Sequence, residues 1–186
     1  MKLSLRYLLV SNYLNLLGFS LFSPFYALFA LRIGAGAFQT GAAWAVYTAV
    51  TGIVIITFGK IEDRIPNKPR LVVIGYFWLA AGALSFLLVK STASLFVVQA
   101  FNAVGSGLLF PAWKSVYGAG EDKGREASEW SLFDGGNMLC TAAASLTGGY
   151  IVKQYGFRSI FVLMFFIQLI AALVSTRLLT RKEPAS

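Results

Sequence analysis

The sequence contains no histidine, a single cysteine (Cys140) and only 8 acidic residues among 186. Without histidine, the chain has no imidazole for acid–base catalysis or for binding a metal ion. One cysteine cannot form a disulfide within the chain or a cysteine-cluster zinc site. Charged residues make up 13% of the chain, against about 25% in an ordinary soluble domain. These shortages exclude histidine-based enzymes and argue against a soluble protein.

Apolar residues are abundant instead, at 57% of the sequence, with a mean hydropathy of +0.68. A hydrocarbon core about 30 Å thick needs about 20 apolar residues per helix. Six such runs are present, separated by short breaks that hold glycine, proline and charged residues. The predicted spans are residues 5–31, 38–58, 71–89, 93–117, 129–150 and 159–179. The sequence therefore predicts an all-α integral membrane protein, with one six-transmembrane-helix bundle over residues 1–186.

Lysine and arginine are unevenly divided between the two ends of the predicted helices. Twelve of the 16 lie on one side, namely Lys2, Arg6, Lys60, Arg64, Lys68, Arg70, Lys114, Lys123, Arg125, Arg177, Arg181 and Lys182. The other side holds Arg32, Lys90, Lys153 and Arg158. Cytoplasmic loops of membrane proteins carry the excess of positive charge. We therefore expect both termini to lie on the cytoplasmic side of the plasma (inner) membrane. On this interpretation the net charge of +8 reflects topology rather than nucleic-acid binding.

Two features recur along the chain at nearly constant spacing. Pro24 and Pro111 punctuate two predicted helices 87 residues apart, and the loop from Gly59 aligns with the segment from Gly149, 90 residues later. A three-helix unit used twice in tandem inserts with opposite topology, as in the 3+3 inverted repeats of transporters. The spacing predicts two such units, residues 1–90 and 91–186. The alternative is coincidence in a glycine-rich apolar chain.

Residues 59–68, Gly-Lys-Ile-Glu-Asp-Arg-Ile-Pro-Asn-Lys, lie in the predicted loop between the second and third helices. They resemble the signature loop of the major facilitator superfamily of transporters, with matches at Gly59, Asp63, Arg64 and Lys68. The segment at residues 148–161 is also similar to the family's passage from helix 5 to helix 6. The resemblance covers the whole chain but only half of the usual twelve-helix transporter. It implies a half-size member that works by alternating access.

The resemblance also assigns roles and shows departures. It implies that residues 59–68 form a conformational latch onto the opposite half of a transporter, which here is a second copy of the chain. We expect Asp63 to cap the helix that begins near residues 126–129 of that copy and Arg64 to pair with the acids there. The alternative is a loop that is merely positive and cytoplasmic. Phe101 and Ala144-Ser145 stand where proton-coupled and antiport members carry an arginine and a Gly-Pro pair. A proton-driven antiporter of the drug-efflux type is therefore not expected.

Polar residues inside the predicted helices fall on narrow stripes when plotted at 100° per residue. They predict a substrate cavity lined by the first, second, fourth and fifth helices, with the third and sixth facing lipid. The candidate cavity residues are Asn12, Asn15, Ser23, Tyr26, Gln99, Asn102, Ser106, Trp113 and Asn137. The alternative is hydrogen bonding that only holds the helices together, worth about 0.6 kcal/mol per contact.

Three further residues are candidates for coupling and gating. Asp134 is the only carboxylate well inside a predicted span, where it is either a titrating coupling site or the partner of Lys114 or the loop cations in a salt bridge. Pro24 and Pro111 each remove a backbone hydrogen bond and are predicted to kink the helices that hold them.

An even number of spans allows two identical copies to lie parallel, like the two halves of a full transporter. We therefore expect a parallel homodimer that moves a small polar or amphipathic solute across the lipid bilayer. The alternative is a non-transporting assembly partner, or one half of a heteromeric transporter. No enzyme activity, metal site or cofactor is expected. Met1 and the polar end at residues 181–186 suggest a complete gene product.

Overall fold

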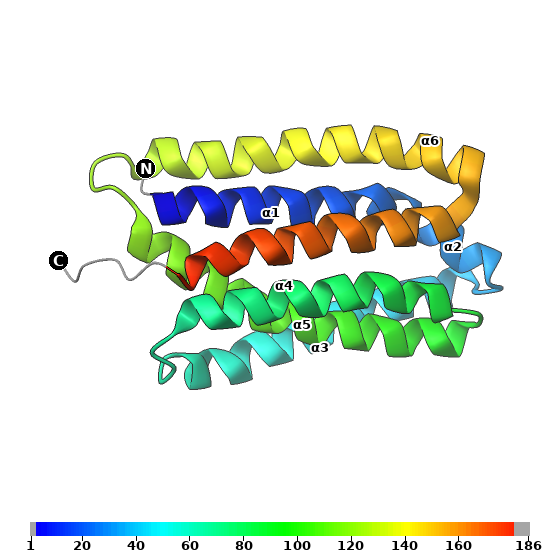
Figure 1. Ribbon diagram of the computed structural model, residues 1–186. Coiled ribbons are helices and arrows are strands. Elements are labelled where there is room, and N and C mark those ends of the chain that lie inside the picture. The colour runs from blue at the N-terminus through cyan, green and yellow to red at the C-terminus, as the bar shows by residue number, and fades with distance from the viewer. Residues whose placement is uncertain (1–2, 181–186) are drawn as a thin grey trace.

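The computed structural model describes residues 3–180, and within that range it consists of helices and short connections with no strand. The helices are α1 (Leu3–Phe22), η1 (Ser23–Phe25), α2 (Tyr26–Arg32), α3 (Ala37–Glu62), α4 (Lys68–Ser85), η2 (Phe86–Leu88), α5 (Thr92–Gly120), α6 (Glu126–Ser175) and η3 (Thr176–Leu178). The long helices lie side by side in one bundle (Figure 1). The all-α prediction is confirmed. Lys2, Arg181 and Lys182 of the charge count lie outside the described residues.

Helix α6 contains a sharp turn at Gly156, whose φ of 76° and ψ of 178° are not helical. This backbone region is essentially restricted to glycine. The chain reverses direction there, so residues 126–155 form a first leg and residues 157–175 a second leg that runs back along the bundle (Figure 1). The start of α1 and the end of the second leg therefore lie at the same end of the bundle, called here the terminal end. The opposite end is called the Gly156 end.

Five helical segments of the described chain are long and apolar enough to cross a membrane, residues 4–32, 37–62, 68–88, 92–120 and 126–178. The first four contain the first four predicted spans almost entirely, and the last contains both the fifth and the sixth. The count of six therefore differs from the five continuous segments, because the Gly156 turn interrupts the helical geometry without a loop. The chain is a multi-pass membrane protein.

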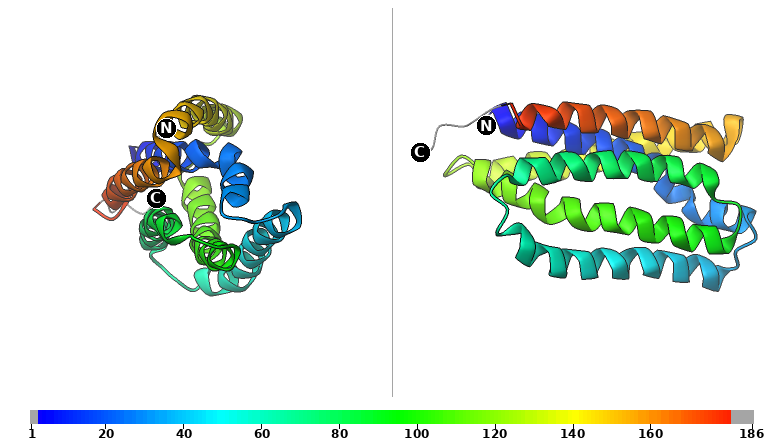
Figure 2. Two further views of the ribbon diagram at one scale, coloured as in Figure 1. Left: turned by 90° about the vertical axis from the view of Figure 1, so that its right-hand side faces the viewer. Right: turned by 60° about the horizontal axis from the view of Figure 1, so that its bottom comes forward.

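The predicted kinks have different outcomes. Pro24 lies in η1, a 3-10 segment that separates α1 from α2, and Phe25 behind it has non-helical angles. The chain bends at this point (Figure 2). Helix α5 instead continues through Pro111 from Thr92 to Gly120 without interruption. Proline removes only one backbone hydrogen bond, which a helix packed between neighbours tolerates.

Each long helix packs against one to three of the others. Helix α1 packs against α6, α5 packs between α3 and α4, and α4 also packs against α6. Helix α3 has only three buried residues, and so has the first leg of α6. Aromatic rings fill the core near the Gly156 end, where Phe22 contacts Phe86 at 5.1 Å and Phe161 at 5.0 Å between ring centroids. Helix α3 and the first leg are therefore covered on one side only and leave one face of the bundle largely unpacked.

Candidate functional site

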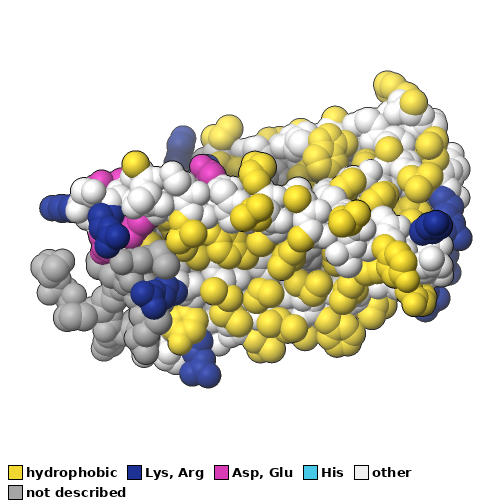
Figure 3. Space-filling view, turned by 90° about the horizontal axis from the view of Figure 1, so that it is seen from above, with side chains coloured by type: hydrophobic (Ala, Val, Ile, Leu, Met, Phe, Trp, Pro, Cys, Tyr) yellow, Lys and Arg dark blue, Asp and Glu magenta, His cyan; other side chains and the backbone are white. Residues whose placement is uncertain are grey.

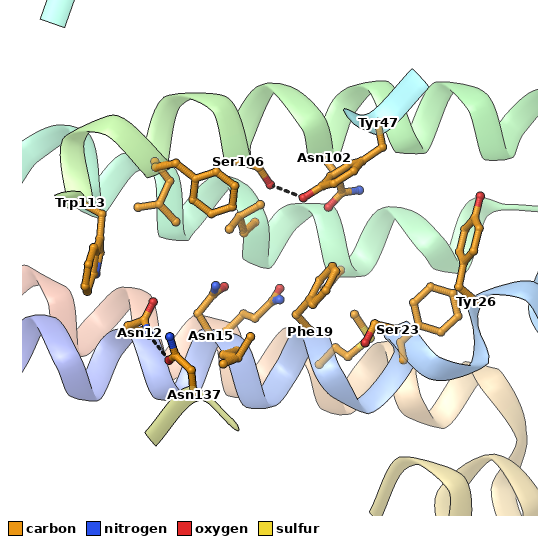
Figure 4. A pocket seen from close by; sticks show the side chains of 18 of the residues that line it. Asn12, Asn15, Phe19, Ser23, Tyr26, Tyr47, Asn102, Ser106, Trp113 and Asn137 are labelled. Carbon is orange, nitrogen blue, oxygen red and sulfur yellow. Dashed lines mark hydrogen bonds between the residues drawn. The ribbon is translucent and has the colours of Figure 1, made fainter. Parts of the chain in front are cut away.

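A cavity of about 400 Å³ lies between α1 and α5. Its side walls come from α3 and the first leg of α6, and its floor from α4 and the second leg (Figure 4). All nine predicted cavity residues line it, namely Asn12, Asn15, Ser23, Tyr26, Gln99, Asn102, Ser106, Trp113 and Asn137. Residues up to 125 positions apart in sequence thus meet at one site.

The wall between α1 and the first leg is held by polar contacts. Nδ2 of Asn12 donates a hydrogen bond to Oδ1 of Asn137 over 2.8 Å (Figure 4). Two turns further along α1, the hydroxyl oxygens of Ser20 and Thr141 lie 3.3 Å apart. Near this pair, the backbone of the first leg comes so close that a Cβ on Gly148 would overlap the Leu21 carbonyl oxygen. The absence of a side chain at Gly148 therefore sets the spacing of this wall.

The wall between α5 and its neighbours is built in the same way. The hydroxyl oxygens of Tyr47 and Ser106 lie 2.9 Å apart, which joins α3 to α5 across the cavity (Figure 4). Nδ2 of Asn102 donates to the carbonyl oxygen of Val98 over 2.9 Å and to that of Gly82 over 3.4 Å. Asn102 therefore also holds α5 against α4. This agrees with the alternative interpretation, in which the polar residues form hydrogen bonds that hold the helices together.

Four other polar atoms on the cavity lining make no hydrogen bond of ordinary geometry with any of residues 3–180. They are Oδ1 of Asn15, Nε2 of Gln99, Nε1 of Trp113 and Oε1 of Gln168. The side chains of Gln99, Trp113 and Gln168 are only 3–4% exposed. A buried polar group left without a partner costs about 1–3 kcal/mol. The lining therefore includes four side chains with a polar atom that the fold leaves unpaired.

Among the described residues, the lining holds one charged side chain, Lys114, and no carboxylate. Lys114 follows Trp113 toward the terminal end of α5 and is exposed. Aromatic rings surround this part of the cavity, because Trp113 stacks on Tyr117 at 4.9 Å and meets Phe133 at 4.7 Å. The site is therefore polar in its middle, aromatic at its sides and positive at one end.

Sequence reasoning missed Gln168 and Lys114 as cavity residues. The expectation that the third and sixth predicted helices only face lipid is also wrong, because Leu79 and Ala83 of α4 and Gln168 of the second leg form part of the floor. The cavity is deep enough to reach past α1 and α5 to the helices behind them. Gln168 was the one amide in its span, which is the signal that could have identified it.

Asp134 does not line the cavity. It is exposed on the first leg of α6, next to the lining residue Phe133. The one cation on the described lining, Lys114, lies on a different helix, α5.

The loop between α3 and α4 is fixed by a hydrogen bond at its α4 end, and its side chains are exposed at its α3 end. Nζ of Lys68 donates a hydrogen bond to Oγ of Ser115 over 2.7 Å, which ties the start of α4 to α5. Asp63 and Arg64 are exposed, and the backbone amide of Asp63 donates to the carbonyl oxygen of Gly59 at the end of α3. The two residues expected to act as a latch are thus exposed at the terminal end of the bundle.

No group of three metal-ligating side chains occurs within residues 3–180.

Comparison with known proteins assigns a family. The model of the Major Facilitator Superfamily matches residues 8–186. An uncharacterized MFS-type transporter, MJ1560 of Methanocaldococcus jannaschii, is 22% identical over 166 residues, which are 89% of this chain and 43% of that protein. The multi-drug resistance efflux pump PmrA of Streptococcus pneumoniae is 25% identical over 179 residues, 94% of this chain and 44% of the pump.

A solved structure shares the fold. The crystal structure of the POT family transporter PepTSo superposes with a TM-score of 0.82 and 16% sequence identity, over 98% of this chain and 39% of that one. The chain therefore spans less than half the length of the proteins it matches here.

Proposed function

Because the chain belongs to the Major Facilitator Superfamily, we propose that it forms half of a secondary transporter that moves a small polar or amphipathic solute by alternating access. One observation carries this proposal. The polar side chains of α1, α3, α5 and both legs of α6 meet in a single cavity, and four of their buried atoms make no hydrogen bond within residues 3–180. Groups that served only to hold the bundle together would be paired with one another.

The proposal includes six membrane crossings arranged as a 3+3 inverted repeat. The two legs of α6 supply the fifth and sixth crossings, since the chain reverses at Gly156. The polar contacts of the walls support the repeat. Tyr47 and Thr51 of α3 bond to α5, and the residues 90 positions later, Asn137 and Thr141, bond to α1. The contacts between α3 and α5 thus have counterparts in the contacts between the first leg and α1, at the 90-residue spacing noted in the sequence.

A second six-helix unit completes the transport pathway in this proposal. Helix α3 and the first leg, which lie on the unpacked face of the bundle, carry large exposed apolar side chains. They include Ile53, Ile56, Met138, Leu139 and Leu146, which are 61–81% exposed. We propose that a second copy, parallel to the first, covers this face, with both termini cytoplasmic in the plasma (inner) membrane. Asp63 and Arg64 then contact residues 126–129 of that copy.

The chemistry of the lining limits the charge and type of solute that the cavity can bind. No carboxylate lines the cavity to neutralise a cation, whereas Lys114 and several amides do line it. A neutral or anionic solute with hydrogen-bonding groups and a flat apolar part fits better than a cation. The exposed position of Asp134, off the lining, favours pairing with surface cations over proton coupling. The competing function is that of an assembly partner, favoured by the hydrogen bonds Asn12–Asn137 and Asn102–Gly82, which hold helices together.

The test is uptake into proteoliposomes of matched panels of neutral, anionic and cationic solutes, alongside the subunit count from native mass spectrometry in lipid nanodiscs. We expect a dimer that takes up neutral or anionic solutes, and loss of uptake in Gln99→Leu. The matched control is Val97→Leu, two residues before Gln99 in α5 but 69% exposed and off the lining. A stable monomer contradicts the homodimer. A dimer that moves no solute, or unchanged uptake in Gln99→Leu, supports the assembly partner.

A further inference from the structure

A second pocket, of about 360 Å³, lies at the Gly156 end of the bundle. It forms where the end of α2, the segment η2 and the turn of α6 meet. Two arginines line it, Arg32 from α2 and Arg158 from just after the turn. Its floor is made of the rings of Phe29, Phe86, Phe157 and Phe161. The pocket thus combines two guanidinium groups with an aromatic base, and the transport cavity shares only Phe86 with it.

The floor of this pocket is fixed by ring packing. Phe29 contacts Phe157 at 5.2 Å and Phe161 at 5.1 Å between centroids, and Phe86 stacks on Phe161 at 5.3 Å. The guanidinium carbon of Arg32 lies 5.9 Å from the centroid of Phe157, within the range of a cation–π contact. Arg32 is therefore held above the floor while its N–H groups stay available.

Positive charge at the Gly156 end is not balanced by acidic residues. Arg32, Lys90, Lys153 and Arg158 belong to this end, whereas the acidic residues within residues 3–180 all belong to the other half of the bundle's length. They are Glu62, Asp63, Glu121, Asp122, Glu126, Glu129 and Asp134. The space-filling view shows lysine and arginine without acidic side chains at this end of the visible face (Figure 3). Arginine pairs with phosphate through two parallel hydrogen bonds, so an anion supplies the missing partner.

Apolar side chains continue from the pocket onto the outer surface of the helices. Leu28 and Leu31 precede Arg32 on α2, and Leu88 ends η2, and these three are 54%, 58% and 73% exposed. The pocket lies where the apolar segments 4–32 and 68–88 end. That is the depth at which phospholipid headgroups meet the acyl chains.

We propose that this pocket binds an anionic phospholipid, with the phosphate between Arg32 and Arg158 and the acyl chains along Leu28, Leu31 and Leu88. Free phosphate offers the same anionic group to the arginines but has nothing to place on the apolar surface. This site does not depend on the proposed transport function, since its lining shares only Phe86 with the cavity.

The test counts lipids bound to the purified protein by native mass spectrometry, in neutral phosphatidylcholine titrated with phosphatidylglycerol. The variant Arg32→Gln/Arg158→Gln is compared with Lys90→Gln/Lys153→Gln, which removes the same charge from the same end but outside the pocket. We expect the arginine variant to bind phosphatidylglycerol at least about tenfold more weakly than the lysine variant, because it loses charge-assisted hydrogen bonds to the phosphate as well as positive charge. Equal losses in the two variants overturn the site, because they indicate only a diffuse positive surface.

Arginine-to-lysine variants and competition by inorganic phosphate test the lipid site further. The variant Arg32→Lys/Arg158→Lys keeps the charge but loses the paired N–H geometry, and we expect it to bind between the wild type and the glutamine variant. Equal thermal stability of all variants in neutral lipid excludes misfolding as the cause of the loss. Inorganic phosphate at millimolar concentration is the competing ligand. If it displaces phosphatidylglycerol completely, the pocket is a site for free phosphate and the lipid assignment is wrong.

Discussion

Asn12 and Asn137 lie 125 residues apart in the sequence, and Nδ2 of Asn12 donates a hydrogen bond to Oδ1 of Asn137 over 2.8 Å. This bond joins α1 to the first leg of α6 at the edge of the cavity. The polar groups on the lining are of two kinds. Some, like this pair, satisfy each other and hold the walls, whereas Asn15, Gln99, Trp113 and Gln168 each keep an atom without a partner. The second kind is the proposed solute site.

The unpaired amides are expected to reduce stability and to be needed for uptake. In Gln99→Leu, a buried amide nitrogen that lacks a partner is replaced by an apolar group, so the free energy of unfolding stays the same or rises by about 1 kcal/mol. Uptake in proteoliposomes falls at least about tenfold, which corresponds to one lost hydrogen bond of about 1.4 kcal/mol. Asn102→Leu is the contrast, because it breaks bonds to Val98 and Gly82 and lowers the thermal midpoint. A loss of stability in Gln99→Leu would show that its amide holds the bundle instead.

The Tyr47–Ser106 contact is expected to contribute modestly to stability. A double-mutant cycle of Tyr47→Phe and Ser106→Ala measures the coupling between the two hydroxyls, which lie 2.9 Å apart. Interhelical hydrogen bonds in membranes average about 0.6 kcal/mol and reach about 1.7 kcal/mol. We expect a coupling within that range from unfolding in detergent. A coupling near zero would mean that the two helices are positioned by packing alone.

Gly148 is expected to tolerate no side chain. Gly148→Ala places a methyl group against the Leu21 carbonyl oxygen and pushes α6 away from α1, at a cost of about 1–3 kcal/mol. Gly135→Ala, on the same leg, meets nothing within 4 Å and gains about 0.5–1 kcal/mol from helix propensity. Thermal unfolding monitored by size-exclusion chromatography distinguishes the two. Equal behaviour of the two variants contradicts the close approach of the helices.

The Asp63 carboxylate is expected to act between units rather than within one. Because Asp63 is exposed, Asp63→Asn changes the stability of the isolated unit by no more than about 0.5 kcal/mol. The proposed latch predicts a smaller dimer fraction at limiting concentration, with Asp63→Glu closer to the wild type. Native mass spectrometry over a dilution series provides the measurement. Identical dimer fractions in all three proteins would assign Asp63 no role in assembly.

The sequence predicted the helices well because membrane spans follow from local composition. The helix boundaries at Arg32, Glu62 and Gly120 fall within a few residues of the predicted breaks, and the break at Gly156 coincides with the non-helical residue in α6. The polar stripes likewise brought nine residues to one cavity, since residues on one face of a helix share surroundings.

The rest depends on tertiary packing that no local pattern contains. Gln168 reaches the cavity because α1 leaves room behind Gly18, where a Cβ would lie 2.9 Å from Cγ of Gln168. Lys114 lines the cavity only because of where α5 lies against its neighbours. Whether Pro111 kinks its helix depends equally on the helices around it, and here α5 continues through it.

The central claim, that the cavity opens alternately to each side of the membrane, can be tested without knowing the solute. The single cysteine is replaced in Cys140→Ser, and Asn15→Cys is then introduced in the middle of the cavity (Figure 4). A membrane-impermeant maleimide is applied from one side in whole cells and from the other in inverted vesicles, with the fully buried Ala171→Cys as the unlabelled control. The account predicts labelling of Asn15→Cys from both sides. Labelling from one side only would contradict it.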